Sequence, residues 1–346
     1  FAHAADVPVA LAGDIHRGGV IASIAGTFEV ISAEDAGRIA AFLVNNFHGD
    51  TALFEDGVRL IEERTGAPCA GVIPHFPDAA KLPAEDAVAL DRATPEPGGA
   101  IKIAVPRLSR IANFDDLDPL VQTADVSVEI VQPGHPLPAD ASLILLPGTK
   151  STLGDLAFLR EQGWDIDIIA HARQGRRVLG LCGGYQMLGR MVHDPDGVEG
   201  PPGSVPGLGL LDIETVLTGD KALESVNGRH VPSGEALSGY EIHLGQTKGP
   251  DCARPFAEIS NRADGAISAN GLIEGTYLHG IFSSDRFRRA YVESLGGSGA
   301  HEFAYEATLD ATLDALGAHL EAHANLDLLL EIARSREGSA QAREAV

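Results

Sequence analysis

The chain has 346 residues, of which 44% are hydrophobic, and this is enough for two domains with cores of their own. No apolar run reaches the length of about 18 residues that a membrane-spanning helix needs. With 26 basic and 49 acidic residues the net charge is −23, which disfavours nucleic acids and anionic membranes as partners.

The first hundred residues place charged loops at the ends of two predicted strands. The run Val7–Gly19 is a buried strand followed by a charged, glycine-rich loop, an arrangement suited to binding phosphate or a metal at the carboxyl edge of a sheet. The segment Asn45–Asp50 follows the apolar stretch 40–44 in the same way. Asp14 is therefore a candidate contact for Mg²⁺ or substrate, although a solvated aspartate in a turn has the same pattern.

A second domain is predicted to follow the proline- and glycine-rich linker Pro95–Gly99, with the boundary near residue 99. Beyond it, strand-like runs alternate with helical stretches, which is typical of a doubly wound parallel sheet in an α/β fold. The strand-like runs are 101–105, 126–131, 142–146 and 178–181, a clear helical stretch is 153–162, and 207–218 and 239–247 resemble added strands.

From residue 302 the pattern becomes helical. Leucines at 309, 313, 316 and 320 are spaced by three and four residues, and we interpret them as a packing face rather than a partner site. Residues from 335 onward have the composition of a disordered tail. We therefore expect three parts: domains over 1–98 and 99–296, and a C-terminal segment over 297–346.

Cys182 stands between glycines at a predicted strand-to-helix junction. The run 177–181 is a short buried strand and 185–191 the predicted start of a helix, so Cys182 would occupy a sharp turn that exposes its sulfur. The backbone N–H of Gly183 could then receive an oxyanion. A small buried hydrophobe is the alternative interpretation of a lone cysteine.

Cys69 and Cys252 have no metal-ligand spacing and the three cysteines cannot all pair, which indicates a reducing cytoplasm.

A base for Cys182 must come from elsewhere in the chain. His279 ends a predicted strand and precedes the glycine of a turn, whereas His243 follows Tyr240-Glu241-Ile242, and spacing leaves both open with His279 preferred. Gly148 follows the apolar run 143–146, where its N–H could be a second oxyanion donor or where it could be a plain turn glycine.

Several of these motifs together resemble the class I glutamine amidotransferase domain, with a flavodoxin-like fold, of the cobyric acid synthase family. The resemblance runs from about Val7 to about Leu295. It rests on the runs around Cys182 and His279 and on the segments 147–152, 110–120, 194–200 and 239–243.

The resemblance implies that Cys182 attacks the side-chain amide of glutamine and that His279 serves as general base and acid. Ammonia would leave, and water would release glutamate from a thioester. Many class I amidotransferases carry a glutamate two residues after the histidine, but this chain has Ile281 there. The third member of the triad is unassigned, and a Cys-His dyad can work if packing or another acceptor fixes the ring.

The first domain resembles part of the ATP-binding synthetase domain of the same family, which is related to dethiobiotin synthetase. Asp14 would then contact Mg²⁺, and Arg17 and Asp50 would contact substrate or phosphate. His16 replaces an aspartate of the usual family pattern, and Asn46 and His48 replace two cations that would face phosphates or corrin carboxylates. Other cations that could face these groups are Arg107, Arg110 and Lys150.

The sequence contains no Gly-x-x-x-x-Gly-Lys-[Ser/Thr] phosphate loop. Because the family's ATP domain begins with a variant of that loop, we expect an N-terminally truncated synthase that lacks its first strands. Such a chain would keep the glutaminase half and would not complete ATP-dependent amide synthesis alone.

For the complete enzyme the resemblance implies amidation of the b, d, e and g carboxylates of adenosylcobyrinic acid a,c-diamide. Glutamine would supply ammonia, ATP and Mg²⁺ would be co-substrates, and no cofactor would be tightly bound. Cobyrinic acid a,c-diamide synthase is the alternative within the class, and the segments 111–114 and 240–243 favour the first assignment. An alternative of another class is a non-catalytic binding or regulatory module, suggested by Ile281, His16 and Asn46.

Overall fold

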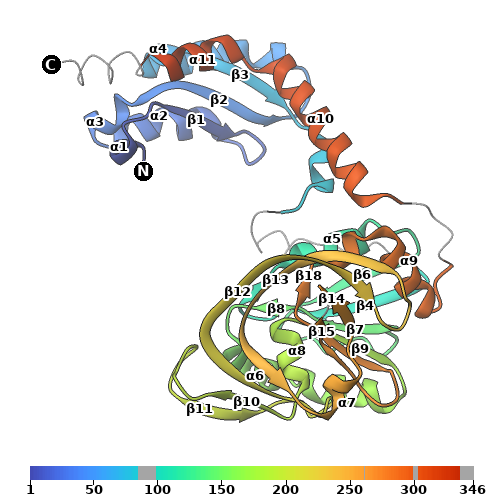
Figure 1. Ribbon diagram of the computed structural model, residues 1–346. Helices are drawn as coiled ribbons and strands as arrows, with labels where there is room; N and C mark the ends of the chain where they lie inside the picture. The colour runs from blue at the N-terminus through green and yellow to red at the C-terminus, as the bar shows by residue number, and fades with distance from the viewer. Residues whose placement is uncertain (85–98, 261, 299–302, 336–346) are drawn as a thin grey trace. The chain divides into compact units, whose positions relative to one another are not determined.

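The computed structural model describes residues 1–84, 99–260, 262–298 and 303–335, and divides the chain into two compact units (Figure 1). Unit 1 comprises residues 1–82 and 309–346, and unit 2 comprises residues 83–308. The C-terminal helices therefore belong with the N-terminal unit, where we had expected a separate segment. Except for Gly99, the predicted linker 95–99 lies outside the described residues, as does the predicted tail beyond Ser335.

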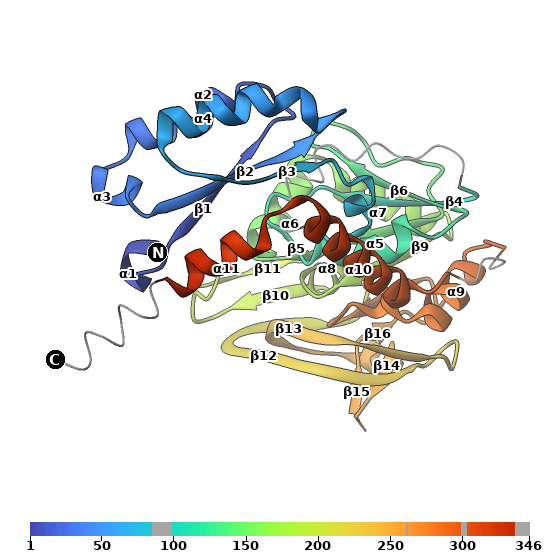
Figure 2. The same cartoon turned by 90° about the horizontal axis from the view of Figure 1, so that it is seen from above.

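Unit 1 is built on a parallel sheet in the order β1-β2-β3, whose strands are β1 (Val9–Asp14), β2 (Ile39–Phe47) and β3 (Cys69–Pro74). Helices α2 (Val20–Val30) and α4 (Glu55–Thr65) pack beside each other (Figure 2). They bury Ile24 and Ile61 against Phe42 and Val44 of β2, so one face of the sheet is covered. The other short elements are α1 (Ala2–Ala5), α3 (Ala33–Ala36), η1 (Thr51–Phe54) and η2 (Pro77–Lys81).

The C-terminal helices α10 (Tyr305–His323) and α11 (Leu326–Arg334) join unit 1 through backbone contacts with β3. The N–H of Asn325 donates to the carbonyl of Ala70 at 2.7 Å, and the ring of His319 bonds the carbonyl of Pro74 at 2.9 Å. Of the predicted leucine face, Leu313 and Leu320 are 54% and 40% exposed, so that face is only partly packed.

The main sheet of unit 2 has five parallel strands in the order β6-β4-β7-β9-β17, with β16 antiparallel at the edge. Numbered along the chain, the parallel strands follow the order 2-1-3-4-5, which is the flavodoxin-like order that we predicted. The strands are β4 (Ile101–Pro106), β6 (Val126–Val131), β7 (Leu143–Leu146), β9 (Arg177–Leu181), β16 (Ala266–Ile267) and β17 (Ile273–Thr276).

Helices cover both faces of this sheet because successive strand residues point in opposite directions. Leu143 and Leu145 pack with Phe287 of α9 (Asp285–Ser294), whereas Ile144 packs with Trp164 on the other face. The helices on the second face are α6 (Thr152–Glu161), α7 (Trp164–Arg173) and α8 (Gly183–Leu188). The doubly wound pattern predicted for this unit is confirmed.

A second sheet contains the long, curved strands β12 (Glu214–His230) and β13 (Ala236–Lys248) (Figure 1). The predicted strand 239–247 is confirmed within β13. The prediction of a strand over 207–218 is wrong for 207–213, because amides there bond to carbonyls at the end of α8, as Leu208 does to Met187 at 2.8 Å. The other strands of this sheet are β10 (Met191–Asp194), β11 (Gly203–Pro206), β14 (Ala257–Ile259), β15 (Arg262–Asp264) and β18 (Leu278–His279).

Short elements complete unit 2: β5 (Ile111–Ala112) paired with β8 (Gly148–Thr149), η4 (Phe114–Leu117), α5 (Asp118–Val121), η5 (Pro250–Ala253) and η6 (Ile281–Ser283). Among the described helices of both units, none is long and apolar enough to cross a membrane.

Candidate active site

Cys182 occupies the sharp turn between β9 and α8, as the sequence predicted. Its backbone has φ 50° and ψ −108°, a strained conformation for a residue with a side chain, and its N–H donates to the carbonyl of Thr276 at 2.8 Å. The next turn of chain passes so close to β7 that a Cβ on Gly184 would lie 2.2 Å from the carbonyl oxygen of Leu146. The glycines thus let the strand turn abruptly into the helix.

The predicted helix 185–191 is wrong at both ends. Helix α8 begins at Gly183 and ends at Leu188, because Gly189 is extended and packs against the backbone of Ile213. Met191 instead begins β10.

The thiol of Cys182 is 8% exposed, and its Sγ lies 3.5 Å from the carbonyl oxygen of Ile242 on β13. The other two cysteines are half-buried, and burial raises the pKa of the Cys69 and Cys252 thiols. Neither of them is placed on a comparable turn.

His279 is fully buried in β18, opposite Tyr240 of β13. Its Nδ1 lies 2.6 Å from Oδ2 of Asp116, and the Tyr240 ring stacks on the imidazole with centroids 5.3 Å apart. Burial opposes a charged imidazole, but the Asp116 carboxylate and the nearby Cys182 thiol outweigh it and raise the pKa of His279 to about 10. Nε2 makes no hydrogen bond within the described part of the chain.

Asp116 is the acceptor that the sequence left unassigned. It lies in η4, is only 3% exposed, and its Oδ1 accepts the backbone N–H of Gly280 at 2.5 Å. The motif 110–120 already carried the resemblance, so a carboxylate within it was the available signal. Its 163-residue separation from His279 hid the contact.

His243, the alternative base, has different surroundings. Its ring stacks on Tyr277 with centroids 3.7 Å apart, and burial lowers the pKa of His243. The structure thus groups Cys182 with His279 and Asp116, and packs His243 against an aromatic ring.

The two proposed oxyanion glycines lie beside this group. A Cβ built on Gly148 would lie 2.9 Å from Cε1 of His279, and one on Gly183 would lie 2.5 Å from Cγ2 of Thr149. Asp155 ties the surrounding loops together: it is fully buried and accepts the N–H of Arg110 at 3.1 Å and the hydroxyl of Thr149.

Of the local cations, Arg110 and Lys150 are exposed and adjacent, because the N–H of Lys150 donates to the carbonyl of Arg110 at 3.0 Å. Arg107 is half-buried and donates to the carbonyl of Leu108 at 2.9 Å.

In unit 1, Asp14 ends β1 and Asp50 follows β2, so both lie at the carboxyl edge of the sheet as predicted. Oδ1 of Asp14 accepts the N–H of His16 at 2.8 Å, and Asp50 caps η1 through the N–H of Ala52. Arg17 is exposed. Within the described ranges, three or more histidine, cysteine, aspartate or glutamate side chains nowhere form a group able to hold a metal.

His16 and His48, at two of the positions that depart from the family pattern, face each other. Nδ1 of His16 lies 3.1 Å from Nε2 of His48, and the ring of His75 stacks on His48 with centroids 4.5 Å apart. Asn46 bonds the ring of His75 at 2.7 Å.

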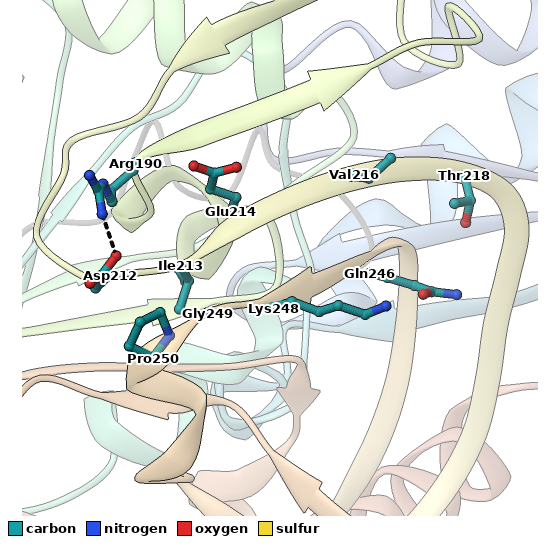
Figure 3. A pocket seen from close by; sticks show the side chains of 10 residues that line it. All are labelled: Arg190, Asp212, Ile213, Glu214, Val216, Thr218, Gln246, Lys248, Gly249 and Pro250. Carbon is teal, nitrogen blue, oxygen red and sulfur yellow. Dashed lines mark hydrogen bonds and ion pairs between the residues drawn. The ribbon is translucent and has the colours of Figure 1, made fainter.

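A pocket of about 650 Å³ lies on β12 and β13, with the ion pair of Arg190 and Asp212 at its rim (Figure 3). Thr215 and Thr247 alternate with the lining residues on these strands and bond each other at 2.6 Å on the opposite face. The hydroxyl of Thr247 also bonds the hydroxyl of the buried Tyr277, so this face of the sheet is directed into the protein. The pocket therefore lies on the outer face. Its lining is Arg190, Asp212, Ile213, Glu214, Val216, Thr218, Gln246, Lys248, Gly249 and Pro250.

Comparison with known proteins identifies the family of the chain. Residues 102–287 match the model of the CobB/CobQ-like glutamine amidotransferase domain. The cobyric acid synthase of Cereibacter sphaeroides (strain ATCC 17025) is 60% identical over 96% of this chain and 69% of its own length. The cobyric acid synthases of Paracoccus denitrificans and Methylorubrum populi are 59% and 55% identical, each over 96% of this chain and 69% of their own lengths.

Proposed function

This chain belongs to the cobyric acid synthase family, and from that premise we propose that its unit 2 releases ammonia from glutamine for the amidation of a corrinoid. The acceptor is adenosylcobyrinic acid a,c-diamide, at its b, d, e and g carboxylates. The observation that carries the proposal is the strained turn that holds Cys182, together with the buried His279, which interacts with the Cys182 thiol and whose Nδ1 is bonded to Asp116.

In the proposed reaction the thiol proton of Cys182 first moves to Nε2 of His279, and the resulting thiolate attacks the side-chain carbonyl carbon of glutamine. The carbonyl oxygen becomes an oxyanion, which the N–H groups of Gly148 and Gly183 stabilise. The carbon–nitrogen bond then breaks, and Nε2 of His279 gives its proton to the departing ammonia. His279 next takes a proton from water, which attacks the thioester, breaks the carbon–sulfur bond and releases glutamate.

The charge state of His279 supports this assignment. With a pKa of about 10, the imidazole is protonated on both nitrogens at neutral pH, and its positive charge can stabilise a thiolate beside it. A proton is then already in position for the leaving ammonia.

We propose that unit 1 is part of an ATP-binding domain like that of dethiobiotin synthetase, with ATP and Mg²⁺ as co-substrates. Magnesium bound with a nucleotide needs only one or two protein carboxylates, so Asp14 fits as a single ligand even without a larger cluster. Arg17 and Asp50 would contact phosphate or substrate. The exposed pair Arg110 and Lys150 could attract the carboxylates of a corrinoid.

The three cysteines are unpaired, and this supports a cytoplasmic location for the protein.

Transfer of labelled nitrogen tests the acceptor. Because we expect this chain alone not to complete the amidation, it is first extended at its amino end by the phosphate-loop segment of the family. The extended protein is incubated with glutamine labelled with ¹⁵N in its amide, ATP, Mg²⁺ and either cobyrinic acid or its a,c-diamide, and the corrinoid is analysed by mass spectrometry. We expect label in the product of the a,c-diamide. Preference for the undecorated acid would instead favour a diamide synthase, and glutamine hydrolysis without transfer to either acceptor would contradict the amidation half of the proposal.

A further inference from the structure

The position two residues after His279 cannot orient the imidazole. Ile281 occupies it, is fully buried, and packs in a core cluster with Leu117, Leu120 and Phe282. A carboxylate at that position would therefore lie among apolar side chains.

A different segment brings a carboxylate to the imidazole. Asp116 contacts His279 and the following residue with both oxygens: Oδ2 lies 2.6 Å from Nδ1, and Oδ1 lies 2.5 Å from the N–H of Gly280. The His279 and Asp116 side chains are 0% and 2% exposed, so water cannot replace either contact. Two bonds from one carboxylate fix both the ring edge and the backbone beside it.

We propose that Asp116 is the positioning residue for His279 and takes the place of the missing glutamate in the catalytic group. This inference rests on the proposed glutaminase function. Ile281 contributes to the arrangement from the other side, because Leu117 and Leu120, which share its core cluster, belong to η4 and α5. The apolar residue thus helps to anchor the segment that carries the carboxylate.

The same segment also restrains the face of the ring. Asn113, three residues before Asp116, has φ 52° and donates from Nδ2 to the hydroxyl of Tyr240 at 2.8 Å. The Tyr240 ring stacks on His279 at an interplanar angle of 23°. Edge and face of the imidazole are therefore both held by contacts that begin in residues 113–116.

Asp116 determines which ring nitrogen of His279 exchanges a proton, and it does not accept a proton itself. The Nδ1 proton stays between the ring and the carboxylate, which leaves Nε2 as the nitrogen that exchanges a proton with thiol, ammonia or water. When Nε2 is protonated, the positive ring lies directly beside the negative carboxylate.

The test compares Asp116→Asn with Asp196→Asn, which removes the same charge from an exposed loop of the same unit. For Asp116→Asn we expect kcat for glutamine hydrolysis to fall by at least about 100-fold, with KM within about threefold of the unmodified protein. Asp196→Asn should stay within about threefold in both constants.

A second readout separates positioning from a structural role. Iodoacetamide alkylates the thiolate of Cys182, and mass spectrometry of the Cys182 peptide gives the alkylation rate at each pH. In Asp116→Asn we expect the pH midpoint of this rate to shift upward, because the positive imidazolium that stabilises the thiolate loses its carboxylate partner. Asp196→Asn should keep the original midpoint. An unchanged midpoint and unchanged kcat in a folded Asp116→Asn would overturn the inference.

If Asp116→Asn does not fold, the unmodified protein still gives an answer. A ¹⁵N-histidine spectrum should show a His279 ring that keeps its Nδ1 proton across neutral pH, and a ring that loses it would contradict the inference. An unmodified protein without glutaminase activity would instead count against the proposed function, so the two failures are distinguishable.

Discussion

Gly148 has no room for a side chain. A Cβ on it would lie 2.9 Å from Cε1 of His279 and 3.1 Å from the carbonyl oxygen of Ala112, and real Cβ atoms essentially never come within 3.0 Å of other heavy atoms. The position of the imidazole therefore depends on the absence of a methyl group at this point of β8.

Gly148→Ala should accordingly displace the His279 ring. A shift of about 1 Å in a catalytic group can cost about 100-fold in rate, so we expect kcat for glutamine hydrolysis to fall by that order. Gly200→Ala is the matched control, since a Cβ there meets no atom within 4 Å. Equal activity of the two variants would contradict the placement of Gly148 beside the catalytic histidine.

Local motifs were enough to single out Cys182, His279, Gly148 and Gly183, which the structure brings together. Each lies at or just beyond the end of a predicted apolar strand, and that pattern is visible in a few consecutive residues. The contact between Asp116 and His279 was not predictable in this way, because it depends on how η4 packs against η6. The roles of all these residues remain predictions for the experiments described.

At the scale of elements, η4 and α5 concentrate carboxylates in a half-buried turn. Asp115 and Asp118 lie close to Asp116, and Oδ2 of Asp118 is buried without a hydrogen bond in the part of the chain described. Burial, reinforced by these two neighbours, raises the pKa of Asp118 to about 7.

Because the pKa of Asp118 is raised, we predict that the free energy of unfolding falls as the pH rises. The unfolded chain ionises Asp118 near pH 4 and the folded protein near pH 7, so stability is lost as the pH rises through that window. Asp118→Asn should therefore raise the free energy of unfolding by roughly 1 to 2 kcal/mol above pH 7 and by much less at pH 4. Denaturant unfolding at several pH values measures this.

The control is Asp196→Asn, which changes an exposed aspartate of the same unit. It should leave the unfolding midpoint unchanged at every pH. A pH-independent effect of Asp118→Asn would contradict the buried charge.

Four strands of the main sheet, β4, β6, β7 and β9, could be predicted because each is a short apolar run between turn residues, whereas β16 and β17 lie outside the predicted runs. The end of α8 and the loop 207–213 could not, since Gly189 and Leu208 take their conformations from contacts with distant backbone. The same holds for β12, whose length reflects pairing with β13 rather than local apolarity.

At the scale of the whole molecule, the linker pattern predicts a boundary near residue 99, whereas the two units of the structure divide between residues 82 and 83. The return of the C-terminal helices to unit 1 was not predicted. That return depends on a hydrogen bond from the backbone N–H of Asn325 to Ala70 and on one between the ring of His319 and the carbonyl of Pro74, which no local sequence pattern predicts. The net charge of −23 would repel a polycarboxylate acceptor, so local cations must offset it.

The most direct test of the central claim is the release of glutamate from glutamine, without ATP, by this protein and by Cys182→Ala. Cys252→Ala serves as the control, because it removes a half-buried thiol from the same unit. We expect release by the unmodified protein and by Cys252→Ala, and none by Cys182→Ala. Release that persists in Cys182→Ala would contradict a catalytic Cys182, and no release by the unmodified protein would favour a binding module over a glutaminase.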